Sequence, residues 1–80
     1  MDKTANSRMV EMKIVTKHSI KNGKTLIPKG TEGLILRIEN SYRIKEIFPN
    51  IDYKTNDWYY IIEFPEIKEY PCLREEIEII

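Results

Sequence analysis

Alternating apolar and polar positions predict a series of short β-strands in this chain of 80 residues. Residues 10–15 (VEMKIV) alternate until their last step, which is the pattern of a half-buried strand. Residues 34–39 (LILRIE) repeat the pattern, and every second residue from Leu34 is expected to face the interior. No segment keeps a 3.6-residue apolar period, so the sequence predicts no long helix.

The clearest strand signal lies at residues 57–64 (DWYYIIEF), where aromatic and β-branched residues are concentrated. One face of this strand would carry Trp58, Tyr60, Ile62 and Phe64, and Tyr59 would point outward from the other face. Pro65 ends the strand. The rest of the chain predicts a short strand within residues 67–74 with Pro71 on an exposed edge, a 3₁₀ turn at residues 74–76 and a brief closing strand.

A turn whose backbone conformation is set by proline and glycine residues lies between the first two predicted strands. Pro28 sets φ and Gly30 permits a reversal, while Gly33 opens an apolar run and is typical of a strand that kinks or bulges. Before this turn, residues 17–25 predict a long polar loop with a tight turn at Asn22-Gly23 and with Ile20 anchored in the core.

Residues 41–56 are interpreted as an insertion, because Pro49-Asn50 and residues 55–57 interrupt the pattern. Within it, residues 42–48 allow either an extension of the second strand or one helical turn. The expected domain organisation is a flexible tail at residues 1–9 followed by one domain at residues 10–80. The expected core residues share apolar character and strand periodicity: Leu34, Leu36, Ile38, Trp58, Tyr60, Ile62 and Phe64, with Ile14 and either Ile77 or Ile79.

The charges cancel overall, with 13 Lys and Arg against 13 Asp and Glu, but they are segregated along the chain. Residues 3–29 hold seven basic residues against Glu11 alone, and residues 63–78 hold six glutamates against Lys68 and Arg74. One interpretation is that the two ends lie on adjacent strands and neutralise each other. The other is a dipolar surface whose basic face meets an acidic or phosphate-bearing partner.

The sequence offers no constellation for catalysis. It holds one histidine, His18, and one cysteine, Cys72, which are too few for a metal site or an activated nucleophile. Cys72 is interpreted as a small apolar core residue. The Gly30-x-x-Gly33 spacing precedes a predicted strand rather than a helix, so it does not suggest a phosphate-binding loop. We therefore expect no enzyme, no cofactor and no metal.

The subcellular location expected from the sequence is the cytoplasm. No apolar run approaches the ~20 residues needed to cross a bilayer, so no membrane association is expected. A single cysteine in so small a domain favours a reducing compartment.

The order of these elements resembles an SH3-like small barrel. The resemblance rests on the strand at 10–15, the turn PKGTEGLI at residues 28–35, the strand WYYIIEF at 58–64 and the close LREEIE at 73–78. Similar turns occur in KOW modules, in the PsaE subunit of photosystem I, in the variable chain of ferredoxin–thioredoxin reductase and in uncharacterised bacterial small barrels. The resemblance implies an all-β fold, an SH3-like small barrel of about five short antiparallel strands with a 3₁₀ turn before the last. Because this fold hosts many functions, it implies no particular activity.

The function expected is a non-catalytic protein-interaction module, a small accessory or regulatory subunit that binds a protein partner through its loops. The candidate binding residues are those of the basic first loop and the aromatic residues of the insertion and the long strand: Lys17, His18, Lys21, Lys24, Lys29, Tyr42, Phe48, Tyr53 and Tyr59. The alternative is a KOW-like RNA- or DNA-binding module that uses the basic loop. A third option is an inhibitor of phage or toxin–antitoxin type. The oligomeric state is left open.

Overall fold

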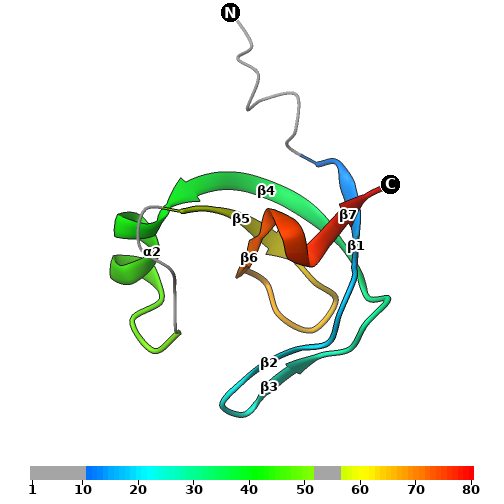
Figure 1. The fold of residues 1–80 in the computed structure, drawn as a ribbon, viewed down its shortest axis with the longest axis horizontal. Helices are drawn as coiled ribbons and strands as arrows, with labels where there is room; N and C mark the ends of the chain where they lie inside the picture. Colours follow the sequence, from blue (N-terminus) through cyan, green and yellow to red (C-terminus); the bar gives the residue numbers. More distant parts are fainter. Residues whose placement is uncertain (1–10, 52–56) are drawn as a thin grey trace, which may run out of the picture.

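The computed structural model describes residues 11–51 and 57–80, and the tail expected at residues 1–9 lies outside this range. Its elements, in chain order, are β1 (Lys13–Thr16), β2 (Ile20–Asn22), β3 (Thr25–Ile27), β4 (Glu32–Asn40), α2 (Ser41–Ile47), β5 (Trp58–Glu63), β6 (Tyr70–Leu73), the 3₁₀ turn η1 (Arg74–Glu76) and β7 (Ile77–Ile79) (Figure 1). Five strands form an antiparallel sheet in the order β6-β5-β4-β1-β7, and β2 and β3 form a separate hairpin. The predicted all-β class and the 3₁₀ turn before the last strand are confirmed, in an arrangement compatible with a small barrel.

The long strand β4 connects the two halves of the sheet and arches across the molecule (Figure 1). Its first part pairs with β1, through Gly33 opposite Ile14, and its remainder pairs with β5. Gly33 is required by close approach, because a Cβ there would lie 2.6 Å from Ile62 Cγ2 and 2.8 Å from the carbonyl oxygen of Glu63. The glycine lets the start of β4 pass against the end of β5.

A β-bulge at Leu36 changes which residues of β4 face the core. Ile35 of β4 pairs with Ile62 of β5, and the next β4 residue to pair with β5 is Arg37, opposite Ile61. Leu36 has no partner on β5 and is therefore the extra residue of the bulge. Ile35 and Ile38, three apart in sequence, therefore lie on one face. The prediction that Leu34, Leu36 and Ile38 share a buried face is wrong, because strict alternation holds only in a regular strand.

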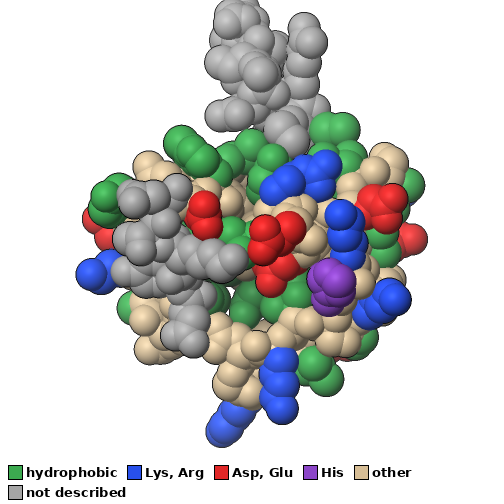
Figure 2. All heavy atoms as spheres, in the orientation of Figure 1, with side chains coloured by type: hydrophobic (Ala, Val, Ile, Leu, Met, Phe, Trp, Pro, Cys, Tyr) green, Lys and Arg blue, Asp and Glu red, His purple; other side chains and the backbone are tan. Residues whose placement is uncertain are grey.

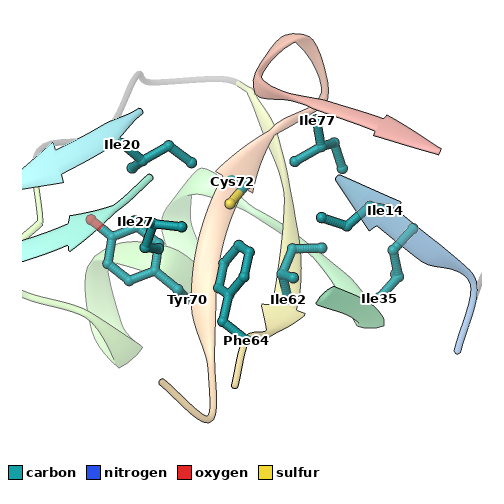
Figure 3. Packing of buried hydrophobic residues seen from close by; sticks show 9 residues of the cluster. All are labelled: Ile14, Ile20, Ile27, Ile35, Ile62, Phe64, Tyr70, Cys72 and Ile77. Carbon is teal, nitrogen blue, oxygen red and sulfur yellow. The ribbon is translucent and has the colours of Figure 1, made fainter. Parts of the chain in front are cut away.

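Strand β5 is buried on both faces, with Ile61 and Ile62 each 0% exposed. The main core is formed by residues of every strand and of the turn after β5: Ile14, Ile20, Ile27, Ile35, Ile62, Phe64, Tyr70, Cys72 and Ile77 (Figure 3). Five of the predicted core residues are not buried there. Trp58 is 62% exposed because it begins β5, beyond the part of the sheet that packs, while Leu34, Leu36, Ile38 and Tyr60 are partly buried.

The helix α2 covers the other face of β5. Its Ile44 is fully buried against Tyr59 and Ile61, with Leu36, Phe48 and Leu73 packed around them. The side chain of Asn40 caps the helix by accepting a hydrogen bond from the Arg43 amide at 3.0 Å. Of the two structures allowed for residues 42–48, the helix is the one adopted. Its presence makes the expectation of an outward, available Tyr59 wrong, because α2 buries that ring to 4% exposure.

Candidate functional site: a basic hairpin beside an apolar groove

The expected loop at residues 17–25 is instead the hairpin β2–β3. Its turn is Gly23-Lys24, with Gly23 at φ 60°, a value suited to the first central position of a tight hairpin turn. Ile20 and Ile27 face each other and point into the core toward Tyr70 and Cys72 (Figure 3). The prediction that Ile20 anchors this segment is confirmed.

The opposite face of the hairpin is exposed and basic. We use the name basic hairpin for residues 17–31, which contain four lysines and no acidic residue. All five candidate side chains of this segment are exposed: Lys17, His18, Lys21, Lys24 and Lys29. In Figure 2, Lys and Arg side chains (blue) lie around the single histidine (purple), and Asp and Glu side chains (red) are also present on the face in view.

A buried threonine fastens the base of the basic hairpin to β1. The Thr16 hydroxyl donates to the Pro28 carbonyl at 2.8 Å and accepts from the Thr31 amide at 3.0 Å. The Gly30 amide also donates to the Thr16 carbonyl at 2.9 Å, and Gly30 has φ 86°, which favours glycine. These bonds hold Lys17 and Lys29 on neighbouring segments. Thr16 was not among the residues predicted from the sequence. The one sequence feature that could have indicated its role is that it is a polar, β-branched residue at the end of a strand.

The tip of the hairpin is attached to the core through Tyr70. The side chain of Asn22 forms a hydrogen bond with the Tyr70 hydroxyl, and the ring of Tyr70 is buried. Burial raises the pKa of Tyr70 above its ordinary value, and the Asn22 contact opposes part of that shift. The hairpin is therefore anchored at its base and near its turn.

An apolar groove of about 320 Å³ runs along β3, and we call it the β3 groove. Leu26, Ile27 and Pro28 line one side, and residues 64–67 of the segment after β5 line the other. Ile27 and Phe64 are core residues, whereas Leu26 is 59% exposed. The groove therefore has a fixed floor and an accessible rim.

The lysines of the basic hairpin form no ion pair within the described residues. The ion pairs found there are made by arginines, from Arg37 to Glu39 and Glu69 and from Arg43 to Glu46. The bond from Arg37 lowers the pKa of Glu69. Strands β1 and β7 are neighbours, as one interpretation of the charge pattern required, but ion pairing across them does not neutralise the hairpin.

The aromatic candidates are not brought together with the basic hairpin. Tyr42 is 66% exposed on α2, Phe48 packs against Ile44, and Tyr53 lies outside the described residues. Trp58, which was assigned to the core, is the exposed aromatic residue that the sequence analysis missed. Its position as the first residue of the strand could have indicated that its side chain is exposed.

At each edge of the five-stranded sheet, one backbone group is bonded to a side chain of the chain itself. On β6, the Leu73 amide donates to a carboxylate oxygen of Glu76 at 2.8 Å, and Pro71, two residues earlier on the same side, has no amide hydrogen. On β7, the Ile77 carbonyl accepts from the Arg74 guanidinium at 3.0 Å. A partner strand beside β6 would therefore find the Leu73 amide occupied and no donor at Pro71. Pro71 is on an edge strand as predicted, but its side chain is buried rather than exposed.

No group of three or more His, Cys, Asp or Glu side chains in residues 11–51 and 57–80 is placed to hold a metal ion. Cys72 is fully buried in the main core, and burial, with the nearby charge of Glu76, raises the pKa of its thiol. A buried, protonated thiol is a poor nucleophile. Within the same residues, no helix has the length and apolar character to cross a membrane.

Comparison with protein-family models, curated proteins and solved structures gives no match.

Proposed function

We propose that this chain is a non-catalytic protein-interaction module, a small accessory or regulatory subunit that binds an acidic surface of its partner through the basic hairpin. The observation that carries the proposal is a set of four exposed lysines that form no ion pair with any residue of 11–51 or 57–80, on a hairpin attached at its base and near its turn. A preorganised cationic surface attracts an acidic partner at little entropic cost. The strand order, with a hairpin after β1 and a 3₁₀ turn before β7, fits the SH3-like barrel that the sequence resembles.

Several features favour a protein partner over a nucleic acid. The sequence pI is about 6.6, whereas nucleic-acid-binding domains are commonly above 9. The basic hairpin contains no arginine, the residue best suited to bidentate phosphate contacts. The exposed aromatic residues Tyr42 and Trp58, which could stack on bases, belong to α2 and β5 rather than to the hairpin.

The test compares a fluorescent glutamate-rich peptide with single-stranded RNA, single-stranded DNA and duplex DNA. Binding is measured by fluorescence anisotropy at low salt (about 20 mM), where screening is weak. We expect the peptide to bind, and the double substitution Lys21→Glu plus Lys24→Glu to abolish that binding. The matched control, Lys45→Glu plus Lys68→Glu, reverses two exposed lysines outside the hairpin and should bind more strongly than the hairpin variant.

Two results contradict the proposal. Oligonucleotide binding tighter than peptide binding at equal salt, and lost in the hairpin variant, would establish the KOW-like alternative. Failure of the peptide to bind, or equal losses in the hairpin and control variants, would remove the basic hairpin as the interaction surface.

A further inference from the structure

We propose that the β3 groove accepts one large apolar side chain from an extended acidic segment of the partner, while carboxylates of that segment contact Lys21 and Lys29. This inference rests on the proposed function and specifies the chemistry of the partner. It makes the site a composite one, with an apolar pocket for anchoring and lysines for charge recognition.

Two lysines of the basic hairpin lie next to residues that line the groove. Lys21 lies directly opposite Leu26 in the hairpin, so the two exposed side chains share the outer face. Lys29 follows Pro28, which lines the groove. One lysine of β2 and one lysine after the end of β3 therefore lie next to lining residues of the groove, and neither forms an ion pair within the described residues.

The backbone of β3 can also contribute to binding. In a hairpin with a two-residue turn, the residues next to the turn are hydrogen-bonded to each other, and the following pair directs its N–H and C=O groups outward. Leu26 belongs to that following pair, opposite Lys21. Among the described residues, no backbone–backbone hydrogen bond outside the helices and strand pairs uses Leu26. An extended segment beside β3 can pair with it there, whereas on β6 the Leu73 amide is bonded to Glu76 and Pro71 has no amide hydrogen.

The groove also has a limited size and an apolar lining. Its volume of about 320 Å³ is at the small end of ligand sites, enough for one or two side chains. Leu26, Pro28, Pro65 and Ile67 offer apolar contact around the buried Ile27 and Phe64. Glu66 on the far side is the one acidic lining residue, so carboxylates of the partner are directed toward the lysine side.

The experiment uses two glutamate-rich peptides that differ at one central position, leucine in one and alanine in the other. We expect the leucine peptide to bind about tenfold more tightly, because it buries a larger apolar side chain. Leu26→Ala should weaken the leucine peptide by about threefold or more and remove much of the preference. The control Ile80→Ala truncates an apolar residue that is similarly exposed but lies outside the groove lining, and should leave the preference unchanged.

Two further readouts separate the groove from general charge attraction. Glu66→Gln should strengthen binding of both peptides, whereas Glu75→Gln, a substitution outside the groove lining, should strengthen it less. Hydrogen exchange of the Leu26 amide should slow when the leucine peptide binds, as expected for a newly formed backbone hydrogen bond.

Equal affinity for the two peptides, unchanged by Leu26→Ala, would overturn the groove inference and leave the basic hairpin as the proposed surface. Failure of both peptides to bind would overturn both proposals. Concentration-dependent dimerisation that Leu26→Ala abolishes would show that a second copy of this chain occupies the groove, and would also overturn the inference.

Discussion

At the scale of single residues, Thr16 has the largest effect on how the candidate site is presented. Its hydroxyl both donates and accepts, so one side chain joins the end of β1 to the Pro28 carbonyl and the Thr31 amide. The residue is 2% exposed, and water does not readily replace those bonds.

Thr16→Val should therefore lower the free energy of unfolding by about 1–2 kcal/mol, because it removes two buried hydrogen bonds at nearly constant volume. Urea denaturation would measure the loss, and hydrogen exchange at residues 29–31 should become faster. Thr25→Val, at a half-buried threonine of the hairpin, is the control and should change stability by less. Equal stabilities of the two variants would show that Thr16 does not fasten the hairpin.

Cys72 makes the stability of the protein dependent on alkaline pH. Burial raises the pKa of its thiol above the ordinary value of 9.0, so the unfolded chain loses this proton before the folded one does. Stability from this group is fully present below about pH 9 and decreases as the pH rises, by up to about 1.4 kcal/mol per pH unit. Tyr70, whose pKa is raised above 10.0 by burial, adds a second decrease at higher pH.

Urea titrations between about pH 8 and about pH 10 would measure this slope. Cys72→Ala should be less stable at neutral pH because of the cavity it leaves, but its stability should fall less steeply just above pH 9. Parallel curves for the two proteins would contradict the assignment to Cys72.

At the scale of elements, α2 and the bulge in β4 determine what packs against each face of β5. The bulge at Leu36 brings Ile35 and Ile38 to one side of the sheet, and the helix covers Tyr59 and Ile61 on the other. With only seven residues, α2 is too short to be stable alone and depends on this packing. Through Ile44 and Phe48, the α2 part of the segment interpreted as an insertion thus contributes to the folded core.

Ile44→Ala should destabilise the protein by about 2–4 kcal/mol, because the isoleucine is completely buried between α2 and β5. Thermal and urea denaturation would measure the change, and near-ultraviolet circular dichroism would report loosening around Tyr59. Lys45→Ala, one residue later and exposed, should alter stability by less than about 0.5 kcal/mol. A loss as small as that of the control would show that α2 is dispensable for the fold.

At the scale of the whole molecule, side chains at the two edges of the sheet limit where a partner can bind. Glu76 and Pro71 limit pairing at one edge of the sheet, and Arg74 limits it at the other. The basic hairpin and the β3 groove remain open, side by side. Zero net charge is thus compatible with a strongly basic local surface, because the acidic residues lie mainly elsewhere in the chain.

The sequence by itself determined the positions of the strands of the five-stranded sheet, the turn at Pro28 and Gly30, and the charge segregation, whereas β2 and β3 were expected to be a loop. These are local properties: apolar alternation marked β1, β4 and β5, and Pro28 with Gly30 marked the reversal. The exposed lysines of the candidate site were also identified, because side chains in a polar segment without apolar neighbours remain in solvent.

Only the tertiary structure decided which face of each strand is buried. Alternation gives two faces but does not say where a bulge exchanges them or whether a second layer covers the outer one. Ile38 was grouped with Leu34 and Leu36 because the bulge was not foreseen, and Tyr59 was expected to be exposed because α2 was not foreseen as a cover. Trp58 was assigned wrongly because burial at a strand end depends on what packs beyond it. The β3 groove likewise exists only through contact between the hairpin and the segment after β5, which are separated by more than thirty residues in the sequence.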